Sequence, residues 1–475
     1  MRCICFLLSA LPLFADGLPT AQPKPPVAAQ PTPREVAWRV LSGVHLAVGK
    51  AQAAVQPYVM LHLAENTVEF NRKLALIEFR DAFADTRILE TTYRVPLQAQ
   101  IVSAAAPIDI PTAIELVRTM RPEPNQRRAR ESWDHSVLAI DAQLLGSNRA
   151  NEAIDLIKLV SLPGVFPNDA ASNIITTLSP KDDRRLSVFG YAATCYRQFP
   201  FPGFTTLLVD HWQEMPLNLV VLAADAVADD GSHASHAELR QVLPILRAVD
   251  APRAARLLNE RPEIEEPEKE PRPISTHVDP DDDRQMQRAS KLAQEYPMRA
   301  LDEVASIRDP ELREQWILQI ARQAFQSGGD ANVASRALYM LQQLPAESQG
   351  ELSGKLGELA AYAGQYQLAE QWVDTSFEVA AKVLEADLNT KSDCGANPAP
   401  RDWWPSTAAY RSAIHGSVAL FHTGAERFLT RMQHDPDLYL LMSVEFARAL
   451  LGSGTTAAPQ ITCRAAVALA KEAAQ

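Results

Sequence analysis

The sequence lacks several features that mark common functional classes. After residue 15 it has no apolar run approaching the roughly 20 residues that cross a bilayer. It has no excess of positive charge: the formal net charge is −12, which argues against nucleic-acid binding, since phosphate contacts need a basic face. Glycine is scarce, at 19 residues, whereas proline is frequent, at 34. This balance favours helices ended by proline over hairpins turned by glycine.

Sequence signatures of catalysis and cofactor binding are also missing. There is no His-Glu-x-x-His, no Gly-x-Ser-x-Gly, no P-loop, no Gly-x-Gly-x-x-Gly and no Cys-x-x-Cys. His233 and His236 lie near Asp229, but a polar loop between helices explains them better than a surface metal site. His415 and His422 are two turns apart and are interpreted as ordinary helix residues. We therefore expect no enzymatic activity, no cofactor and no bound metal.

The N-terminus has the form of a secretory signal. Arg2 precedes an apolar run from Cys3 to Ala15, which is too short to span a bilayer and has the length of a signal-peptide core. A segment rich in proline and alanine follows at residues 16–33, and we expect it to be disordered. The sequence thus predicts a signal peptide at residues 1–15 and an exported mature protein, periplasmic or secreted, with no transmembrane segment.

Removal of that signal would leave an odd number of cysteines, namely Cys195, Cys394 and Cys463. In an oxidising compartment three cysteines permit at most one internal disulfide. Cys394 and Cys463 share the C-terminal part of the chain and are the candidate pair. The alternative is that the thiols are free and buried.

One segment is too polar to fold by itself. Residues 261–284 carry five prolines and nine carboxylates in 24 positions, so they cannot bury enough apolar surface to become ordered. We interpret the segment as an acidic, proline-rich linker between two helical regions, residues 34–260 and 285–475. The two regions either stay apart or fold against each other with the linker looping out.

Local patterns on both sides of the linker predict helices. Thr32, Pro33 and Glu35 form a capping-box start, and Asp435 precedes a proline in a second start signal. The run 217–224 could be a buried strand, but its apolar residues fall at helical spacing. We see no alternating segment bounded by turn pairs, so the chain is expected to be all-α.

A short apolar pattern recurs along the chain. Alanine is followed by Ile or Leu, with large apolar residues four and seven places after the alanine and a proline soon afterwards. The copies lie at 113–120, 153–160, 300–307 and 337–344. The first two are 40 residues apart and the last two 37, a spacing typical of stacked helix hairpins. The pattern therefore predicts an α-solenoid of antiparallel helix hairpins.

The clearest repeat unit is "LGELAAYAGQYQLAEQW", residues 356–372. Leu356 and Gly357 stand in its first helix, where glycine lets a partner helix approach closely. Gly364 and Tyr366 stand at the turn, and Ala369 is small where the two helices cross. These residues resemble the tetratricopeptide repeat.

The preceding unit, residues 321–345, keeps the same spacing. Gly329 and Ala334 each lie 35 residues before their counterparts, against 34 in the family. Other positions depart from the family pattern: its early tryptophan position is Ser353 and its closing proline position is Ala381. The resemblance implies a divergent helical-repeat protein, a curved stack of hairpins whose concave face binds peptides or proteins, with no catalytic residues to transfer.

Trp403 and Trp404 stand out from the repeats. They lie just before a predicted helix that begins with Pro405. Adjacent tryptophans in a loop are a candidate ligand platform, since aromatic faces supply large contact areas. The favoured alternative is that one ring packs into the hydrophobic layer while the other covers the helix end.

Two function classes follow from these observations. The first is an exported helical-repeat scaffold, in the cell envelope or outside the cell, that binds a protein or peptide partner. The alternative is an exported enzyme of the α/α-toroid type acting on polysaccharide, in which helix hairpins close a ring around an aromatic and acidic pocket.

Overall fold

The computed structural model describes residues 31–123, 126–229, 234–264, 279–326, 331–390, 400–452 and 454. Within these ranges the regular structure is helical, and the only β-type pairing is an isolated bridge between Leu162 and Val165. The expected all-α class is confirmed. None of the helices described is both long and apolar enough to span a membrane.

The helices of residues 31–264 follow one another closely, with short 3₁₀ turns labelled η between some of them. They are α1 (Pro33–Ala47), η1 (Val48–Lys50), α2 (Gln56–Thr67), α3 (Arg72–Asp85), η2 (Thr86–Ile88), α4 (Thr91–Ala105), α5 (Ile110–Thr119), α6 (Arg127–Gly146), α7 (Ala150–Val160), α8 (Asn168–Thr177), α9 (Asp183–Gln198), α10 (Phe204–His211), η3 (Trp212–Glu214), α11 (Leu217–Asp229), α12 (His236–Val249), α13 (Ala251–Glu260) and η4 (Pro262–Ile264).

The helices from residue 279 onward continue in the same manner. They are α14 (Pro280–Leu292), α15 (Pro297–Val304), α16 (Pro310–Gln326), α17 (Ala331–Leu341), α18 (Ala346–Tyr362), α19 (Tyr366–Thr390), η6 (Arg401–Trp403), α20 (Pro405–Phe421), η7 (His422–Met432) and α21 (Pro436–Leu450).

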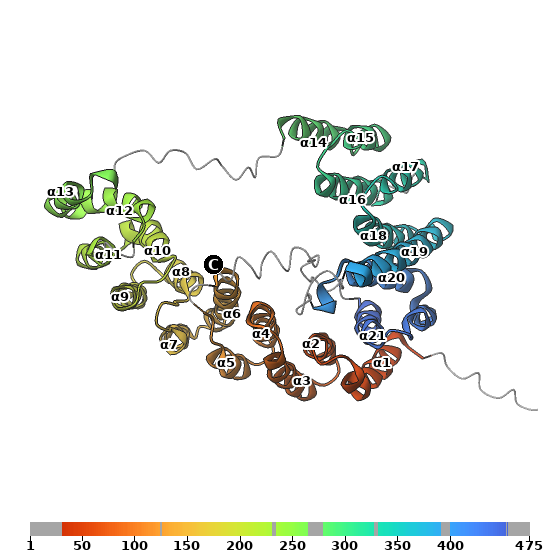
Figure 1. The fold of residues 1–475 in the computed structure, drawn as a ribbon, viewed down its shortest axis with the longest axis horizontal. Coiled ribbons are helices and arrows are strands. Elements are labelled where there is room, and N and C mark those ends of the chain that lie inside the picture. Colours follow the sequence, from red (N-terminus) through yellow and green to blue (C-terminus); the bar gives the residue numbers. More distant parts are fainter. Residues whose placement is uncertain are drawn as a thin grey trace, which may run out of the picture.

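The hairpins stack into a curved α-solenoid. Figure 1 shows α2, α4, α6, α8, α10 and α12 along the inside of the curve, and α3, α5, α7, α9 and α11 along its outside. The curve turns so far that α1 and α2 pack against α21. The described chain therefore forms an open ring in which the first and last helices meet, while α13 and α14 lie apart (Figure 1).

Hydrogen bonds between side chains of successive hairpins have a regular sequence separation. His45 and Glu78 are 33 residues apart, Asn173 and Asp141 are 32 apart, and Arg336 and Asp302 are 34 apart. Equivalent positions of neighbouring repeats lie side by side in a solenoid. The sequence separation of these bonded residues therefore gives the number of residues in one repeat. It is slightly shorter than the spacings of 35 to 40 residues between the sequence patterns.

The buried apolar side chains form two clusters. The first runs from α1 to η4 and continues through the later part of α19 into α20, η7 and α21. The second comprises α14 to the early part of α19. The last helices thus share a core with the first ones, and α19 contributes to both clusters. The domain boundaries predicted around residues 261–284 stay a prediction, since residues 265–278 lie outside the described residues.

The predicted helix starts have the expected capping geometry. At α1 the Glu35 amide donates to Thr32 Oγ1 at 3.3 Å, while the Thr32 amide donates to Glu35 Oε2 at 2.8 Å. At α21 the Leu438 amide donates to Asp435 Oδ1 at 3.1 Å. The run 217–224 lies in helix α11 and not in a strand.

The segment 356–372 forms the predicted hairpin. Gly364 turns the chain between α18 and α19 with φ +75°, a left-handed conformation that favours glycine. Leu356 and Ala369 are fully buried, whereas Tyr366 is 64% exposed and does not pack into the turn. A Cβ on Gly357 would lie 3.1 Å from Val373 Cγ2, so its lack of a side chain permits the close approach of α19. In the preceding unit Ala334 is also fully buried, and Gly329 lies outside the described residues.

A closer crossing, between α18 and α20, was not predicted from the sequence. A Cβ on Gly354 would lie 2.4 Å from the carbonyl carbon of Ser412, and one on Gly350 would lie 2.8 Å from Ala409 Cβ. From the other side, a Cβ on Gly416 would lie 2.9 Å from the Gly354 carbonyl oxygen. The two backbones are therefore in direct contact, and a side chain on any of these glycines would force them apart.

Candidate functional site

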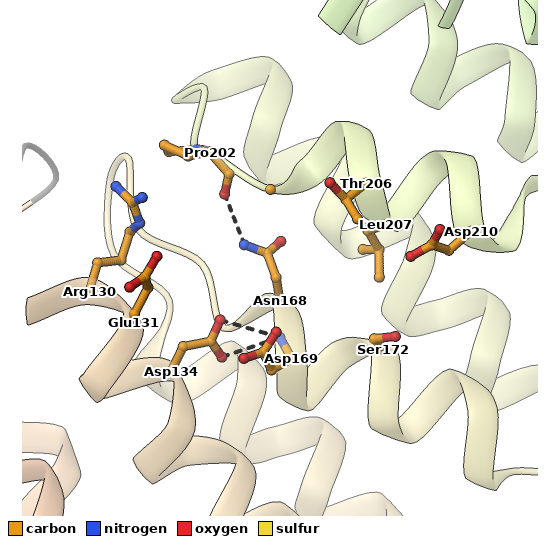
Figure 2. Close-up of a pocket in the computed structure, with 11 residues that line it drawn as sticks. Arg130, Glu131, Asp134, Asn168, Asp169, Ser172, Pro202, Thr206, Leu207 and Asp210 are labelled. Atoms are coloured by element: carbon orange, nitrogen blue, oxygen red, sulfur yellow. Dashed lines mark hydrogen bonds between the residues drawn. The ribbon is translucent and has the colours of Figure 1, made fainter. Parts of the chain in front are cut away.

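A cavity of about 280 Å³ opens between α6, α8 and α10, three successive helices on the inside of the ring (Figures 1 and 2). We call it the α8 cavity. Its walls are Arg130, Glu131 and Asp134 from α6, Asn168, Asp169 and Ser172 from α8, and Pro202, Gly203, Thr206, Leu207 and Asp210 from α10 and the turn before it.

Asp134 joins α6 to the start of α8. The residue before α8 is Pro167, which offers no side-chain cap. The Asp169 amide instead lies 3.3 Å from both carboxylate oxygens of Asp134, so a neighbouring helix satisfies a free N–H at this helix end. Asp134 is only 7% exposed. Burial, and then repulsion by the Asp169 carboxylate, raise the pKa of Asp134 to about 7.

Asn168 occupies the middle of the cavity wall (Figure 2). Its Nδ2 donates to the Pro202 carbonyl at 2.9 Å and to the Phe166 carbonyl at 3.3 Å. These two acceptors fix the orientation of the amide, because the oxygen cannot replace the nitrogen there. Oδ1 is buried and has no hydrogen-bond donor among the described residues. Gly203 makes room for this side chain: its φ is +95°, and a Cβ there would lie 2.7 Å from Asn168 Nδ2.

A second cavity, of about 400 Å³, adjoins the first and shares Asp210 with it. His211 lines it and is 7% exposed. Its Nε2 lies 3.0 Å from Ser172 Oγ, whereas its Nδ1 is buried without a hydrogen-bond partner in the described part of the chain. Arg185, also on this wall, donates to the Ile175 carbonyl at 2.6 Å.

The described residues of the two cavities form neither a catalytic triad nor a metal site. Ser172 and His211 could suggest an activated nucleophile, but that chemistry needs a carboxylate on the far nitrogen of the histidine, and Nδ1 has none in the described residues. No group of three or more His, Cys, Asp or Glu side chains there has the geometry of a metal site. The exposed carboxylates of Glu131, Asp169 and Asp210 make the α8 cavity an acceptor-rich, negatively charged surface.

The tryptophans predicted as a ligand platform lie elsewhere, and both are buried. Trp403 is 1% exposed and Trp404 7%. Tyr93 meets the Trp403 ring edge-on at 5.4 Å, and the Arg128 guanidinium lies 5.2 Å from its centre. The Arg401 guanidinium lies 4.2 Å from the centre of the Trp404 ring. Protein groups thus cover these rings, so the structure gives the ligand-platform hypothesis no support.

The other predicted sites are only partly covered by the structure. Cys394, Cys463 and His233 lie outside the described residues, so the disulfide stays a prediction. Cys195 is a free, partly buried thiol on α9. His236 is the first residue of α12, with its Nε2 3.7 Å from a Glu263 carboxylate oxygen.

A buried charge network lies where the ring closes, and no sequence pattern predicted it. His62 on α2 lies 3.3 Å from the Asp402 carboxylate, which also pairs with Arg411 on α20. Arg411 lies 3.7 Å from the Glu445 carboxylate on α21, and Glu445 accepts from His415 at 2.8 Å. All five side chains are at least nine-tenths buried. His415, expected to be an ordinary helix residue, is part of this network.

The pairing overcomes the cost of burying these charges. Burial alone would lower the pKa of His62, but the Asp402 carboxylate raises it to about 9. Burial would raise the pKa of Glu445, but the hydrogen bond from His415 and the charge of Arg411 lower it to about 2. The charged forms are therefore the stable ones at neutral pH.

The chain was compared with protein-family models, curated proteins and solved structures. No protein-family model matches the chain, and no curated protein matches it. Among solved structures, it is similar to a circular tandem repeat protein with novel repeat topology and enhanced subunit contact surfaces. That similarity covers 93% of this chain and 91% of the other, at 11% identity and a TM-score of 0.17. The superposition is too poor to support an argument, so the assignment of this chain as a helical-repeat protein of α-solenoid architecture rests on its own helices and contacts.

Proposed function

We propose that this protein is an exported scaffold whose concave surface binds an extended segment of a peptide or protein. The observation that carries the proposal is the pair of adjoining cavities beside α8 and α10, of which the α8 cavity lies among the inner helices of the ring (Figure 1). Extended segments bind by placing successive side chains into separate pockets. Export is proposed from residues 1–15, and the compartment, periplasmic or extracellular, is left open.

The sizes of the cavities support a side-chain binding role. Pockets for small molecules range from about 300 to 1,000 Å³, and these cavities, at about 280 and 400 Å³, lie at or below the lower part of that range. Each has a polar atom that is buried without a partner among the described residues, Asn168 Oδ1 in one and His211 Nδ1 in the other. Both atoms are buried, so they mark where the hydrogen bonding of the cavity walls is incomplete.

The tetratricopeptide-like character of residues 321–372 belongs to the same proposal. In that family the concave face binds peptides, and a similar use of the inner helices would follow here. The polysaccharide enzyme was expected to place a tryptophan in an acidic cleft. With Trp403 and Trp404 both covered, no observation favours it.

Selection of peptides by the mature chain, residues 16–475, tests the proposal. Thr206 is exposed and lines the α8 cavity, so Thr206→Trp fills the cavity with little effect on folding. Thr194, exposed on the outer helix α9, provides the matched control Thr194→Trp. A displayed peptide library should yield binders whose affinity, measured by fluorescence anisotropy, falls at least tenfold with Thr206→Trp and is unchanged with Thr194→Trp. Failure to select any binder, or binders that tolerate both variants, would reject the proposed function.

A further inference from the structure

We propose that the contact between the inner helices α6 and α8 is pH-sensitive: the buried carboxyls of Asp134 and Asp141 take up protons as the pH falls, and the two helices are then held together more firmly. Because this contact lies within the chain, it requires no partner and does not depend on the proposed function. The positions of the two carboxyls, their burial and the groups that face them support it.

Asp134 and Asp141 connect α6 to α8 at two places. They are seven residues apart in α6, about two helical turns, and therefore point in similar directions. Asp134 accepts from the Asp169 amide at the start of α8. One turn further along α8, Asn173 Nδ2 donates to Asp141 Oδ2 at 2.6 Å. The two carboxyls thus form polar links across one helix contact.

Asp141 is the more deeply buried of the two. It is 0% exposed, and its Oδ1 is buried without a hydrogen-bond partner among the described residues. The Asn173 amide is neutral and cannot balance a charge, and a buried charge without a counter-charge is costly. Burial accordingly raises the pKa of Asp141 to about 6, although the hydrogen bond from Asn173 acts in the other direction.

Asp134 faces more negative than positive charge. Asp169 from α8 and Asp210 from α10 line the same cavity wall, together with Arg130 and Glu131 from α6 itself. Burial, and then the Asp169 carboxylate, raise the pKa of Asp134 to about 7. Burial also lowers the pKa of Arg130, the cation one turn earlier on α6. These surroundings favour the protonated form of Asp134.

His135 is a further titratable group at this contact. Its Nε2 lies 3.6 Å from an Asp169 carboxylate oxygen, and at least half of each side chain is exposed, so the pair contributes little. A proton on His135 would attract Asp169, which is the same direction of effect as the protonation of Asp134 and Asp141.

The other helices packed against α6 are α4, α5 and α7. Their charged side chains are exposed or have partners elsewhere: Arg94 on α4 donates to Thr91, Glu115 on α5 pairs with Arg80, Arg118 on α5 is exposed, and Glu152 and Asp155 on α7 pair with Arg149 and Lys158.

The closure of the ring has buried carboxyls in the opposite situation. Asp402 and Glu445 are equally buried, but Arg411 lies beside both of them. Although burial alone would raise the pKa values of both carboxyls, the charge of Arg411 and the hydrogen bonds from neighbouring histidines lower them. Between pH 5 and 8 the charge therefore changes at the contact of α6 with α8, whereas Asp402 and Glu445 stay ionised.

The direction of the pH effect follows from the raised pKa values. Asp134 and Asp141 both start from an ordinary value of 3.8. Their contribution to the contact is therefore complete below pH 3.8, and it is lost as the pH rises through 6 for Asp141 and through 7 for Asp134. Since α6 and α8 form much of the α8 cavity wall, acidification should make this part of the inner surface more rigid.

Hydrogen exchange of the mature chain, residues 16–475, tests the proposal. Exchange of the α8 amides, divided by the intrinsic rate at each pH, reports how often the contact opens. We expect the protection of α8 to be about tenfold or more greater at pH 5 than at pH 8. Helix α12 is the internal reference, because its only carboxyl, Glu238, is partly exposed. If the protection of α8 changes no more than that of α12, the proposal is wrong.

Neutral amides in place of the two carboxyls should remove the effect. Asp134→Asn/Asp141→Asn should protect α8 at pH 8 at least as well as the wild type, and its protection should change by less than about threefold between pH 5 and pH 8. The matched control Glu152→Gln/Asp155→Asn removes two exposed carboxylates from α7 and should keep the full change of the wild type.

A double variant that keeps the wild-type pH dependence would overturn the proposal. If the double variant does not fold, as judged by circular dichroism, Asp141→Asn alone replaces it. This single variant should reduce the pH-dependent change in α8 protection, and an unreduced change would also overturn the proposal.

Discussion

Replacement of Gly354 by alanine should test the close crossing of α18 and α20. The added Cβ would lie 2.4 Å from the carbonyl carbon of Ser412 and 2.7 Å from the Ala413 amide nitrogen. Ordinary contacts begin at 3.4 Å, so the backbones of α18 and α20 must separate by about 1 Å. Because the clashing atoms are backbone, no side-chain rotation can relieve the contact.

The expected loss follows from two opposing effects. Overpacking of this kind costs about 1–3 kcal/mol, and we expect the upper end because Gly350 and Gly416 make close contacts at the same crossing. Alanine is favoured over glycine in a helix by about 1 kcal/mol. The net fall in the free energy of unfolding should therefore be about 2 kcal/mol.

Substitution of a second glycine should change the free energy of unfolding in the opposite direction. Gly43 lies inside α1, and a Cβ there would meet nothing within 4 Å. Gly43→Ala should raise the free energy of unfolding by about 0.5–1 kcal/mol, through helix propensity alone. Urea unfolding of both variants, followed by circular dichroism, measures the two changes. If Gly354→Ala is as stable as the wild type while Gly43→Ala is stabilised as expected, the direct backbone contact between α18 and α20 is contradicted.

Three other predictions concern the buried charges and the cavity. Asp402→Asn removes the closer of the two carboxylates beside the buried Arg411, and the carboxylate that faces His62, and should cost about 3–5 kcal/mol in thermal or urea unfolding; a loss below about 1 kcal/mol would contradict the network. The pKa of His62 is raised from 6.5 to about 9, so its contribution is complete below pH 6.5 and is lost as pH rises through 9, whereas Glu445, lowered from 4.5 to about 2, contributes above pH 4.5 and loses its contribution as pH falls through 2. The melting temperature should therefore fall on both sides of that range, and a value unchanged between pH 6.5 and 9.5 would refute the His62 pairing. Gly203→Ala should cost about 1–2 kcal/mol, since alanine is strained at φ +95° and its Cβ would displace Asn168, and it should weaken peptide binding measured by anisotropy.

The parts of the fold that could be predicted from the sequence are those formed by residues close together in the chain. Thr32 with Glu35, and Asp435 ahead of a proline, mark helix starts because the capping partners are three residues apart at most. Gly364 marks a turn because only glycine takes its conformation without strain. In each case the interacting groups are close in sequence.

The candidate site is harder to predict because its residues are dispersed along the chain. Asp134 and Asp169 are 35 residues apart, and Ser172 and His211 are 39 apart. The repeat period could have placed these positions side by side, since it predicts which helices are neighbours. It could not show that Asn168 would keep a buried oxygen without a donor, because this depends on the Pro202 carbonyl and on the path of the turn before α10.

The closure of the ring depends on contacts that no local pattern contains. His62 and Asp402 are 340 residues apart, and Arg448 and Glu65 are 383 apart. A solenoid normally ends in repeats with a polar outer face, but here α1 and α21 cover each other, so their apolar faces resemble those of any internal helix. An apolar contact surface alone would also allow α1 or α21 to pack against other amphipathic helices. Buried charges are more selective, since a helix that brings no carboxylate to His62 would leave it unpaired and costly. The network therefore favours the observed pairing of the first and last helices over other pairings of amphipathic helices.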